Sequence, residues 1–136
     1  MPSDPASPSR PDTQPAEGNL RAAISNAVVR ILAEYTGRGA TSSRTTLSGD
    51  WVFVTLADTL TKGERKLAEI GHSDFVINSR KAFQNAMRED MSRDVEALTG
   101  RKVIAFLSDN HIDPDVGLEA MMLEPERNEH ADRAAR

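Results

Sequence analysis

The sequence predicts an α+β domain of two layers, in which a four-stranded, mainly antiparallel sheet carries two long helices on one face. The main observation is a change of hydrophobic period, from the three-and-four spacing of a helix to short apolar runs, in the order α-β-β-α-β-β. A second observation is that both long helical segments end in the same tripeptide, Thr-Gly-Arg, at residues 36–38 and 99–101. The tripeptide alone is weak evidence for an internal duplication, and the repeated order of elements is the stronger fact.

The composition excludes several classes of protein. The 17 Lys and Arg residues are scattered among 21 Asp and Glu residues, for a net charge of −4, so the basic patch that nucleic acid binding needs is not evident. The chain has no cysteine, which excludes disulfides, thiolate metal sites and a cysteine nucleophile. Its apolar runs are far shorter than the roughly 20 residues of a membrane-spanning helix, and the N-terminus has no apolar export signal. We therefore expect a soluble cytoplasmic protein that inserts no segment into a membrane.

The two ends of the chain differ from its middle. Residues 1–18 are rich in proline, and residues 124–136 are charged and lack large apolar side chains. Neither segment can bury enough surface to offset the entropy of ordering. We predict a disordered tail at residues 1–18, a single domain at residues 19–123 and a charged flexible tail at residues 124–136.

The first half of the domain is predicted as a helix and a hairpin. Residues 19–36 carry an apolar stripe at helical spacing, formed by Leu20, Ile24, Ala27, Val28, Ile31, Leu32 and Tyr35. Gly37 follows where a left-handed C-cap is needed. Residues 40–46 form a first strand, and residues 48–50 form a turn. Residues 51–56 are mostly apolar, which predicts a second strand in the middle of the sheet.

The second half repeats this plan after a short helix. Thr61 and Glu64 match a capping box, and Ser73 or Asp74 can cap a longer helix over residues 74–98. The apolar stripe of the longer helix is interrupted by an arginine; its members are Val76, Phe83, Met87, Met91, Val95 and Leu98, with Arg80 intruding. Gly100 then ends this helix as Gly37 ends the first.

Two further strands complete the predicted sheet. Residues 103–107 form a strand that is buried by composition, residues 108–115 form a turn rich in Asp, Asn and Pro, and residues 116–123 form the last strand. On that last strand, one face is formed by Val116, Leu118, Ala120 and Met122.

One face of this sheet has no predicted helix to cover it. Trp51 and Phe53 point to the opposite side from Val52 and Val54, because side chains alternate along a strand. Exposed apolar patches mark interfaces, so we expect a homo-oligomer or docking onto a larger partner. The interface candidates are Trp51, Phe53, Met87 and Met91, although methionines at helical spacing are more often core residues.

The loop of residues 37–44 is the one candidate ligand site. Its glycines, hydroxyls and guanidinium groups suit a small anion, with Arg38, Thr41, Ser43 and Arg44 as the candidate ligand-binding residues. Phosphate sites, however, lie at helix N-termini, and this loop follows a helix C-terminus. We favour an architectural loop, with structural turn residues at Gly37, Gly39 and, in the second half, Gly100. The scattered histidines and the acidic turn at residues 109–115 predict no metal site and no catalytic set, and we expect no cofactor.

Three ordered blocks of sequence resemble the MpsC-like domain family. They are Glu-Tyr-Thr-Gly-Arg-Gly-Ala-Thr at residues 34–41, Leu-Thr-Lys-Gly-Glu-Arg-Lys-Leu at 60–67, and Leu-Thr-Gly-Arg-Lys-Val at 98–103 with Phe-Leu-Ser-Asp at 106–109. The similarity covers residues 19–123 and departs at Ala40, where the family usually has proline. The family is named after the third component of a sodium-translocating membrane-potential-generating system. The resemblance implies a cytoplasmic accessory to membrane proteins that handle ion gradients and inorganic carbon, and it implies no catalytic residue.

Two functions therefore compete at the level of sequence. The first is a non-catalytic accessory or regulatory module that docks, through its uncovered sheet face or its long helix, onto the cytoplasmic side of a membrane transporter complex. The alternative is a small-anion-binding sensor or enzyme that uses the loop of residues 37–44, with bicarbonate or phosphate as the ligand.

Overall fold

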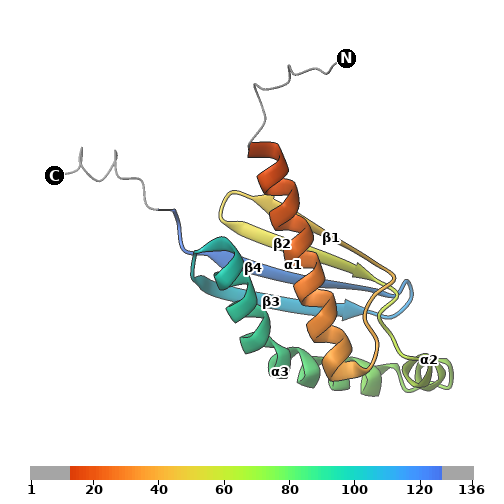
Figure 1. The fold of residues 1–136 in the computed structure, drawn as a ribbon. Coiled ribbons are helices and arrows are strands. Elements are labelled where there is room, and N and C mark those ends of the chain that lie inside the picture. The colour runs from red at the N-terminus through yellow and green to blue at the C-terminus, as the bar shows by residue number, and fades with distance from the viewer. Residues whose placement is uncertain (1–12, 127–136) are drawn as a thin grey trace, which may run out of the picture.

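The computed structural model describes residues 13–126 of the 136-residue chain, and for residues 13–15 it describes the backbone only. Three helices and four strands follow one another along the chain (Figure 1). They are α1 (Thr13–Thr36), β1 (Ser42–Ser48), β2 (Trp51–Ala57), α2 (Lys62–Glu69), α3 (Ser73–Thr99), β3 (Val103–His111) and β4 (Val116–Leu123). The strands form one antiparallel sheet in the order β1-β2-β4-β3. The predicted α+β class and the central position of β2 are confirmed.

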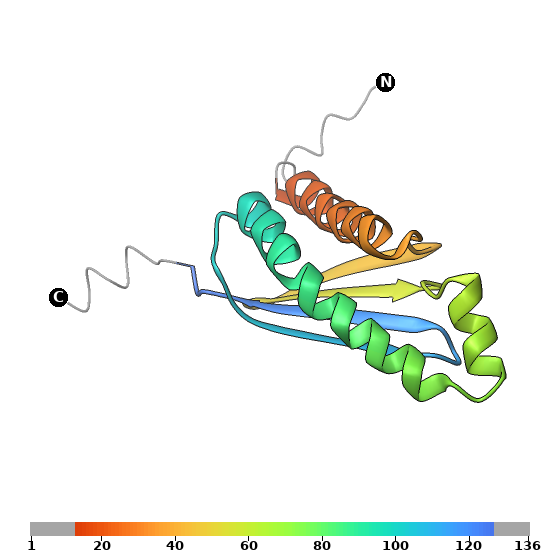
Figure 2. The same ribbon diagram turned by 90° about the horizontal axis from the view of Figure 1, so that it is seen from below.

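The two long helices, α1 and α3, form a single layer on one side of the sheet. Helix α1 packs on β1 and β2, α3 packs on β3, and the two helices contact each other. Figure 2, turned by 90°, shows this layer on one side of the sheet and the opposite side without a covering element. The prediction of two long helices on one face is confirmed.

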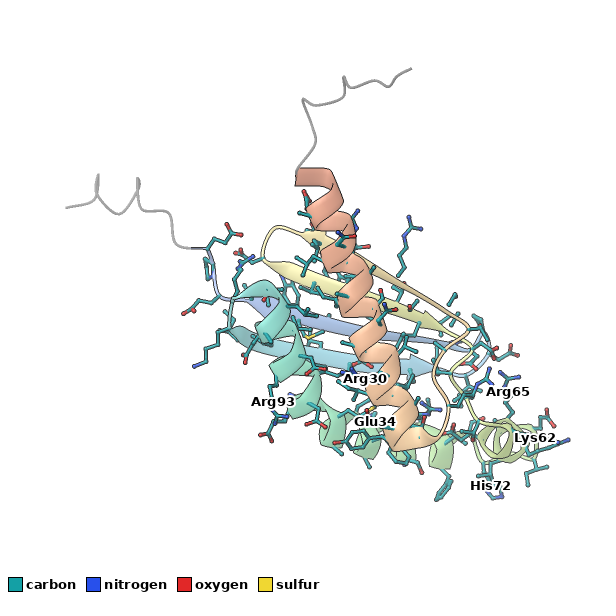
Figure 3. The ribbon with its side chains drawn as sticks, viewed as in Figure 1. Arg30, Glu34, Lys62, Arg65, His72 and Arg93 are labelled. Carbon is teal, nitrogen blue, oxygen red and sulfur yellow. The ribbon has the colours of Figure 1, made fainter. Side chains whose placement is uncertain are left out.

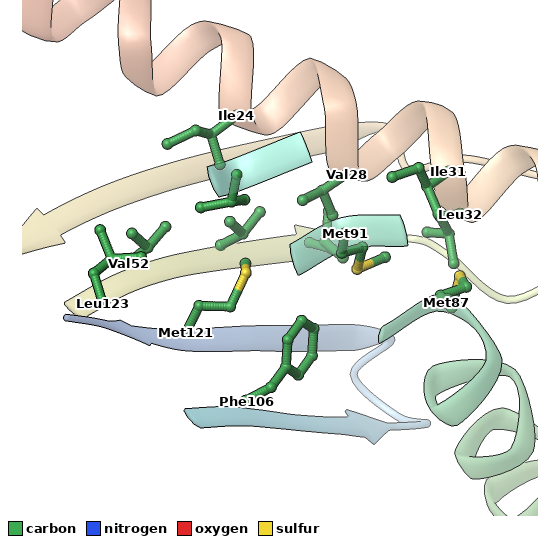
Figure 4. Packing of buried hydrophobic residues seen from close by; sticks show 13 residues of the cluster. Ile24, Val28, Ile31, Leu32, Val52, Met87, Met91, Phe106, Met121 and Leu123 are labelled. Carbon is green, nitrogen blue, oxygen red and sulfur yellow. The ribbon is translucent and has the colours of Figure 1, made fainter. Parts of the chain in front are cut away.

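The core lies between this helix layer and the sheet. Alternate residues of β2 point into it, and Val52 and Val54 are fully buried. Other members come from α1, α3, β3 and β4 (Figure 4); they include Ile24, Val28, Ile31, Leu32, Met87, Met91, Val95, Phe106, Met121 and Leu123. Met87 and Met91 are each 1% exposed, so their prediction as interface residues is wrong. Both methionines lie on the side of α3 that faces the sheet, where an amphipathic helix buries its apolar stripe.

The strand boundaries depart from the predictions at two places. Strand β1 runs from Ser42 rather than from residue 40, and its hairpin turn is Gly49-Asp50, with a positive φ of 59° at Gly49. The predicted turn at residues 108–115 is shorter, because β3 continues to His111. Asp109 and Asn110 pair with Leu118 and Gly117 across the ladder. Backbone pairing to β4 overrides the turn preference of these polar residues.

The helix starts also differ from the predictions. Helix α1 begins at Thr13, so the predicted disorder of residues 13–18 is wrong, while residues 1–12 and 127–136 lie outside the described residues. The capping box of α2 is confirmed: the Thr61 hydroxyl accepts from the Glu64 amide at 3.1 Å, and Glu64 Oε1 accepts from the Thr61 amide at 2.8 Å. Helix α3 has His72 at its N-cap without a side-chain hydrogen bond, so neither Ser73 nor Asp74 caps it.

The Thr-Gly-Arg tripeptide adopts the same structure in both halves. The Thr36 hydroxyl donates to the Leu32 carbonyl, and the Thr99 hydroxyl donates to the Val95 carbonyl, both at 2.8 Å. Gly37 and Gly100 have positive φ values of 85° and 71°, as the predicted left-handed caps require. The arginine that follows then donates from Nε to a carbonyl just beyond its own hairpin: Arg38 to Asp58, and Arg101 to Glu124. Each half is thus a helix connected by one arginine to the end of its hairpin.

Candidate functional site

The uncovered sheet face, which is the side of the sheet away from α1 and α3, is the first candidate surface. Cross-strand pairing arranges it in four rows, each read from β1 through β2 and β4 to β3. The rows are Ser42, Ala57, Val116 and His111; Arg44, Thr55, Leu118 and Asp109; Thr46, Phe53, Ala120 and Leu107; and Ser48, Trp51, Met122 and Ala105. The residues of this face on the central strands β2 and β4 are apolar except for Thr55, and its two charged residues, Arg44 and Asp109, lie on the outer strands.

Large apolar side chains remain accessible on this face. Leu107 is 62% exposed and Leu118 is 39% exposed. The Trp51 and Phe53 rings stack with centroids 5.6 Å apart and planes 5° from parallel. The two aromatic rings therefore form one rigid apolar surface over β2, in the position that the sequence predicts for an interface.

A shallow, open depression lies at one end of the uncovered sheet face. Its volume is about 870 Å³. The lining includes Ser43 and Arg44 from β1 together with Asp109 and His111 from β3. Arg38 and Thr41 are not among its lining residues. The four candidate anion-binding residues are thus divided between two places, and the carboxylate of Asp109 stands in the same depression as the guanidinium of Arg44.

Arg38 lies in an ion-pair cluster behind the end of β2. Its Nη2 contacts the carboxylate of Asp58 at 2.8 Å, and Arg65 contacts the other oxygen of the same carboxylate. Asp58 has a positive φ of 61°, an uncommon conformation for a residue other than glycine. The amide of Thr41 donates to the Ala57 carbonyl at 3.1 Å. Arg38 and Thr41 therefore hold the chain between α1 and β1 against the end of β2.

Gly39 supports the same arrangement by its small size. A Cβ at this position would lie 2.8 Å from Cγ1 of Val29 on α1, closer than two carbon atoms can approach. The loop therefore passes over α1 where only glycine fits. This geometry agrees with the architectural interpretation of the loop.

The α2–α3 corner, defined here by Lys62, Lys66, Ile70, His72 and Phe75, is the second candidate surface. Ile70 is 69% exposed and Phe75 is 60% exposed. Figure 3 shows Lys62 and His72, with Arg65, at this end of the molecule, past the ends of the strands. The corner thus combines two accessible apolar side chains with exposed cationic groups.

The chain matches the model of a known protein family. The model of the family described as Na+-translocating membrane potential-generating system (MpsC) matches residues 16–125. The chain belongs to the MpsC family. The match to MpsC begins at residue 16, within α1, and extends to just beyond β4, so it covers most of α1 and all of the other helices and strands. No curated protein and no solved structure matches the chain.

Within residues 13–126, none of the helices combines the length and the apolar character that a membrane span requires. In the same part of the chain, no three His, Asp or Glu side chains gather closely enough to bind a metal ion.

A buried ion pair of this MpsC chain was not predicted. Arg80, 1% exposed, donates from Nε to Glu64 Oε2 at 2.8 Å and from Nη2 to the Thr59 carbonyl at 2.7 Å. The sequence signal was Arg80 itself, which interrupts the apolar stripe of α3. Its partner lies 16 residues away on α2, and helical spacing alone could not identify it.

Glu119 is a second buried charge that sequence reasoning missed. It lies on the core side of β4, is 4% exposed, and pairs across the sheet with Val54 and Ser108. Burial raises the pKa of Glu119 to about 7. The nearby Ser108 hydroxyl, which has no well-aligned hydrogen-bond partner, and the Arg88 guanidinium lower this pKa by less. Only the pairing register reveals that Glu119 points inward with Met121.

Proposed function

We propose that this MpsC-family chain is a non-catalytic, cytoplasmic accessory subunit of a sodium-translocating, membrane-potential-generating system, and that it binds its membrane partner through the α2–α3 corner. The family match supports the link to the sodium system. The observation that carries the docking role is the exposure of Ile70 and Phe75, at 69% and 60%. Large apolar side chains left in water next to polar residues are typical of protein-binding surfaces.

The local structure makes this corner suitable for docking. The capping box fixes the start of α2, and the Arg80–Glu64 ion pair joins α2 to α3. Ile70 and Phe75 therefore project from a rigid support, so little conformational entropy is lost when a partner covers them. An exposed aromatic anchor on such a support is the usual centre of a binding hot spot.

The charge of the corner indicates the chemistry of the partner. Lys62 and Lys66 are exposed on α2, where Lys66 precedes Ile70 by four residues, and Glu69 is a local counter-charge to Lys66 at 3.7 Å. A complementary surface would offer an apolar pocket with acidic residues at its rim. We infer that the partner presents such a pocket on a cytoplasmic loop or helix of the membrane complex.

The test is site-specific photo-crosslinking in the native host. A photoreactive phenylalanine analogue replaces Phe75 in the full-length chain, and in a control chain it replaces Asn85, which is also exposed on α3. We expect the Phe75 position to crosslink to a membrane protein and the Asn85 position not to do so. The double variant Ile70→Asp, Phe75→Asp should lose copurification with that protein, while its circular dichroism spectrum stays that of the unchanged chain.

Two outcomes would contradict the proposal. One is equal crosslinking from both positions, which would mean that the corner has no special role. The other is capture of soluble proteins alone by the Phe75 position, which would remove the link to a membrane system.

A further inference from the structure

We propose that the uncovered sheet face is covered by a second copy of this chain, in a two-fold symmetric dimer whose axis runs nearly parallel to β2 and β4 and passes between them. This inference is independent of the α2–α3 corner, since no residue is shared between the two surfaces. It rests on the order of the strands and on the row in which each outward side chain lies. Both copies then retain their corners free for another partner.

The shape of the face is self-complementary under this axis. Rotation about a line parallel to the central strands exchanges left and right along each row, so β2 of one copy lies over β4 of the other. Phe53 then faces Ala120, and Trp51 faces Met122, because each pair shares a row. Large side chains meet small or flexible ones, as interdigitating sheets require. The stacked rings of Trp51 and Phe53 in one copy thus pack on the smaller or more flexible side chains of β4 in the other copy.

The charges of the face are self-complementary under the same axis. Arg44 on β1 and Asp109 on β3 belong to one row, at opposite edges of the sheet. Both side chains are exposed, and neither forms an ion pair with another residue of the described range 13–126. The rotation places β1 of one copy over β3 of the other, so Arg44 faces Asp109 at both edges of the interface.

An axis perpendicular to the strands does not produce this match. Such a rotation lays each strand over the same strand of the second copy. If it passes through the row of Arg44, it sets arginine against arginine and aspartate against aspartate, which is repulsive. If it passes between the second and third rows, it sets Arg44 over Thr46 and Asp109 over Leu107, and if it passes between the first and second rows, it sets Arg44 over Ser42 and Asp109 over His111. Of these two directions, only the axis parallel to the strands sets Arg44 against Asp109, and it requires a copy of this same face.

The charge-reversal experiment tests this geometry in the full-length chain. We expect Arg44→Asp and Asp109→Arg each to weaken dimerisation, measured by sedimentation equilibrium, by at least about tenfold, because two symmetry-related contacts become like-charge contacts at once. The double variant should return the dissociation constant to within about threefold of the unchanged chain. A matched control is Arg21→Asp, a charge reversal at an exposed position of α1 on the helix side, which should have no effect.

The intrinsic fluorescence of Trp51 provides a second readout. Trp51 is the only tryptophan of the chain, and it lies partly exposed at the start of β2, in the fourth row of the proposed interface. Its emission should shift to shorter wavelength as concentration rises, with the same midpoint as the change in mass. In each single charge variant this midpoint should move to higher concentration, and a far-ultraviolet circular dichroism spectrum checks that the variant is folded.

Several results would overturn the proposal. These are a monomer across the micromolar range, a dimer whose assembly leaves the Trp51 emission unchanged, and folded single variants that dimerise as well as the unchanged chain. A double variant that stays as weak as the single variants would also reject this axis. Failure of the corner to crosslink, in contrast, would leave the dimer unaffected.

Discussion

At the scale of single residues, two ionisable side chains are buried, and they differ in whether they have a partner of opposite charge. Arg80 is 1% exposed and has both the Glu64 carboxylate and the Thr59 carbonyl as partners. Glu119 is 4% exposed, and burial outweighs the favourable influence of its neighbours. A buried charge is tolerated when it is paired and is costly when it is not. Arg80 should therefore be most sensitive to loss of its partner, and Glu119 to pH.

The Arg80–Glu64 pair leads to a stability prediction. Glu64→Gln preserves the shape of the side chain and the acceptor of the capping box but leaves the Arg80 charge without a counter-ion. We expect a loss of about 3 kcal/mol in the free energy of unfolding, measured by urea denaturation. Arg93→Ala removes the two ion pairs of an exposed arginine, with Glu89 and Asp90, and should cost less than about 1 kcal/mol. Equal effects of the two variants would show that the buried pair contributes nothing special.

Glu119 leads to a prediction about pH. Its pKa rises from 4.5 in the free side chain to about 7 in the folded protein, so the folded state retains a proton that the unfolded chain loses. The free energy of unfolding should therefore fall as pH rises from about 4.5 to about 7, by up to about 3 kcal/mol. Glu119→Gln should remove most of this decrease when both proteins are unfolded in urea at about pH 5 and about pH 8. A pH dependence that survives in Glu119→Gln would assign it to other groups.

At the scale of elements, the structure consists of two helix–hairpin units that are built alike. In each unit a threonine closes the last helical turn, a glycine with positive φ ends the helix, and an arginine reaches the carbonyl after the second strand. The units meet through β2 and β4, which pair antiparallel in the middle of the sheet. The second strand of each unit is thus central, and the first strand is at an edge.

The loop between α1 and β1 should be sensitive at its glycines rather than at Arg44. Gly37→Ala places a Cβ at a left-handed position and should cost about 1–2 kcal/mol. Gly39→Ala should also destabilise the fold, because its Cβ would meet Val29 at 2.8 Å. Arg44→Ala changes an exposed side chain and, at concentrations where the chain is monomeric, should stay within about 0.5 kcal/mol of the unchanged chain. Chemical denaturation of the three variants ranks them, and a larger cost for Arg44→Ala would reverse the architectural interpretation.

Strand β3 contributes its main core contact through Phe106. This ring is 9% exposed and packs in the core cluster, with the guanidinium of Arg88 5.3 Å from its centroid. Phe106→Ala should cost about 3–5 kcal/mol in the free energy of unfolding. Ile104 lies two residues earlier and is 51% exposed, so Ile104→Ala is the matched control and should cost less than about 1 kcal/mol. A cost below about 1 kcal/mol for Phe106→Ala would contradict its role in the core.

At the scale of the whole molecule, the two candidate surfaces lie on different sides and can act together. The uncovered sheet face suits a second copy of the chain, and the α2–α3 corner suits a partner of another kind. Anion binding, in contrast, would have to use Arg44 without Arg38, since Arg38 already contacts the Asp58 carboxylate at 2.8 Å.

Titration calorimetry separates docking from anion sensing. We expect no saturable heat when bicarbonate or phosphate is added to the chain, because a free anion would compete with Asp58 at Arg38 and would find a single exposed guanidinium at Arg44. The variant Arg38→Ala, Arg44→Ala is the control for any heat that is seen. Saturable binding by the unchanged chain that is lost in this variant would revive the sensor hypothesis.

The sequence by itself determined the order of elements, the central position of β2, the glycine caps and the presence of an uncovered sheet face. These features depend on local periodicity and on backbone conformations that few residues adopt, such as the left-handed caps at Gly37 and Gly100. The three blocks that include both Thr-Gly-Arg tripeptides also pointed to the MpsC family, which the match to residues 16–125 confirms.

Only the tertiary structure decided which residues meet across the chain. In the structure, Arg80 pairs with Glu64 and Glu119 points into the core. Met87 and Met91 are buried, and Arg38 lies apart from the depression that Arg44 lines. None of these outcomes follows from spacing, because each depends on the pairing register or on a contact between distant segments. The side of a strand or helix that is buried is a property of its neighbours in space, and the sequence pattern states only that two different sides exist.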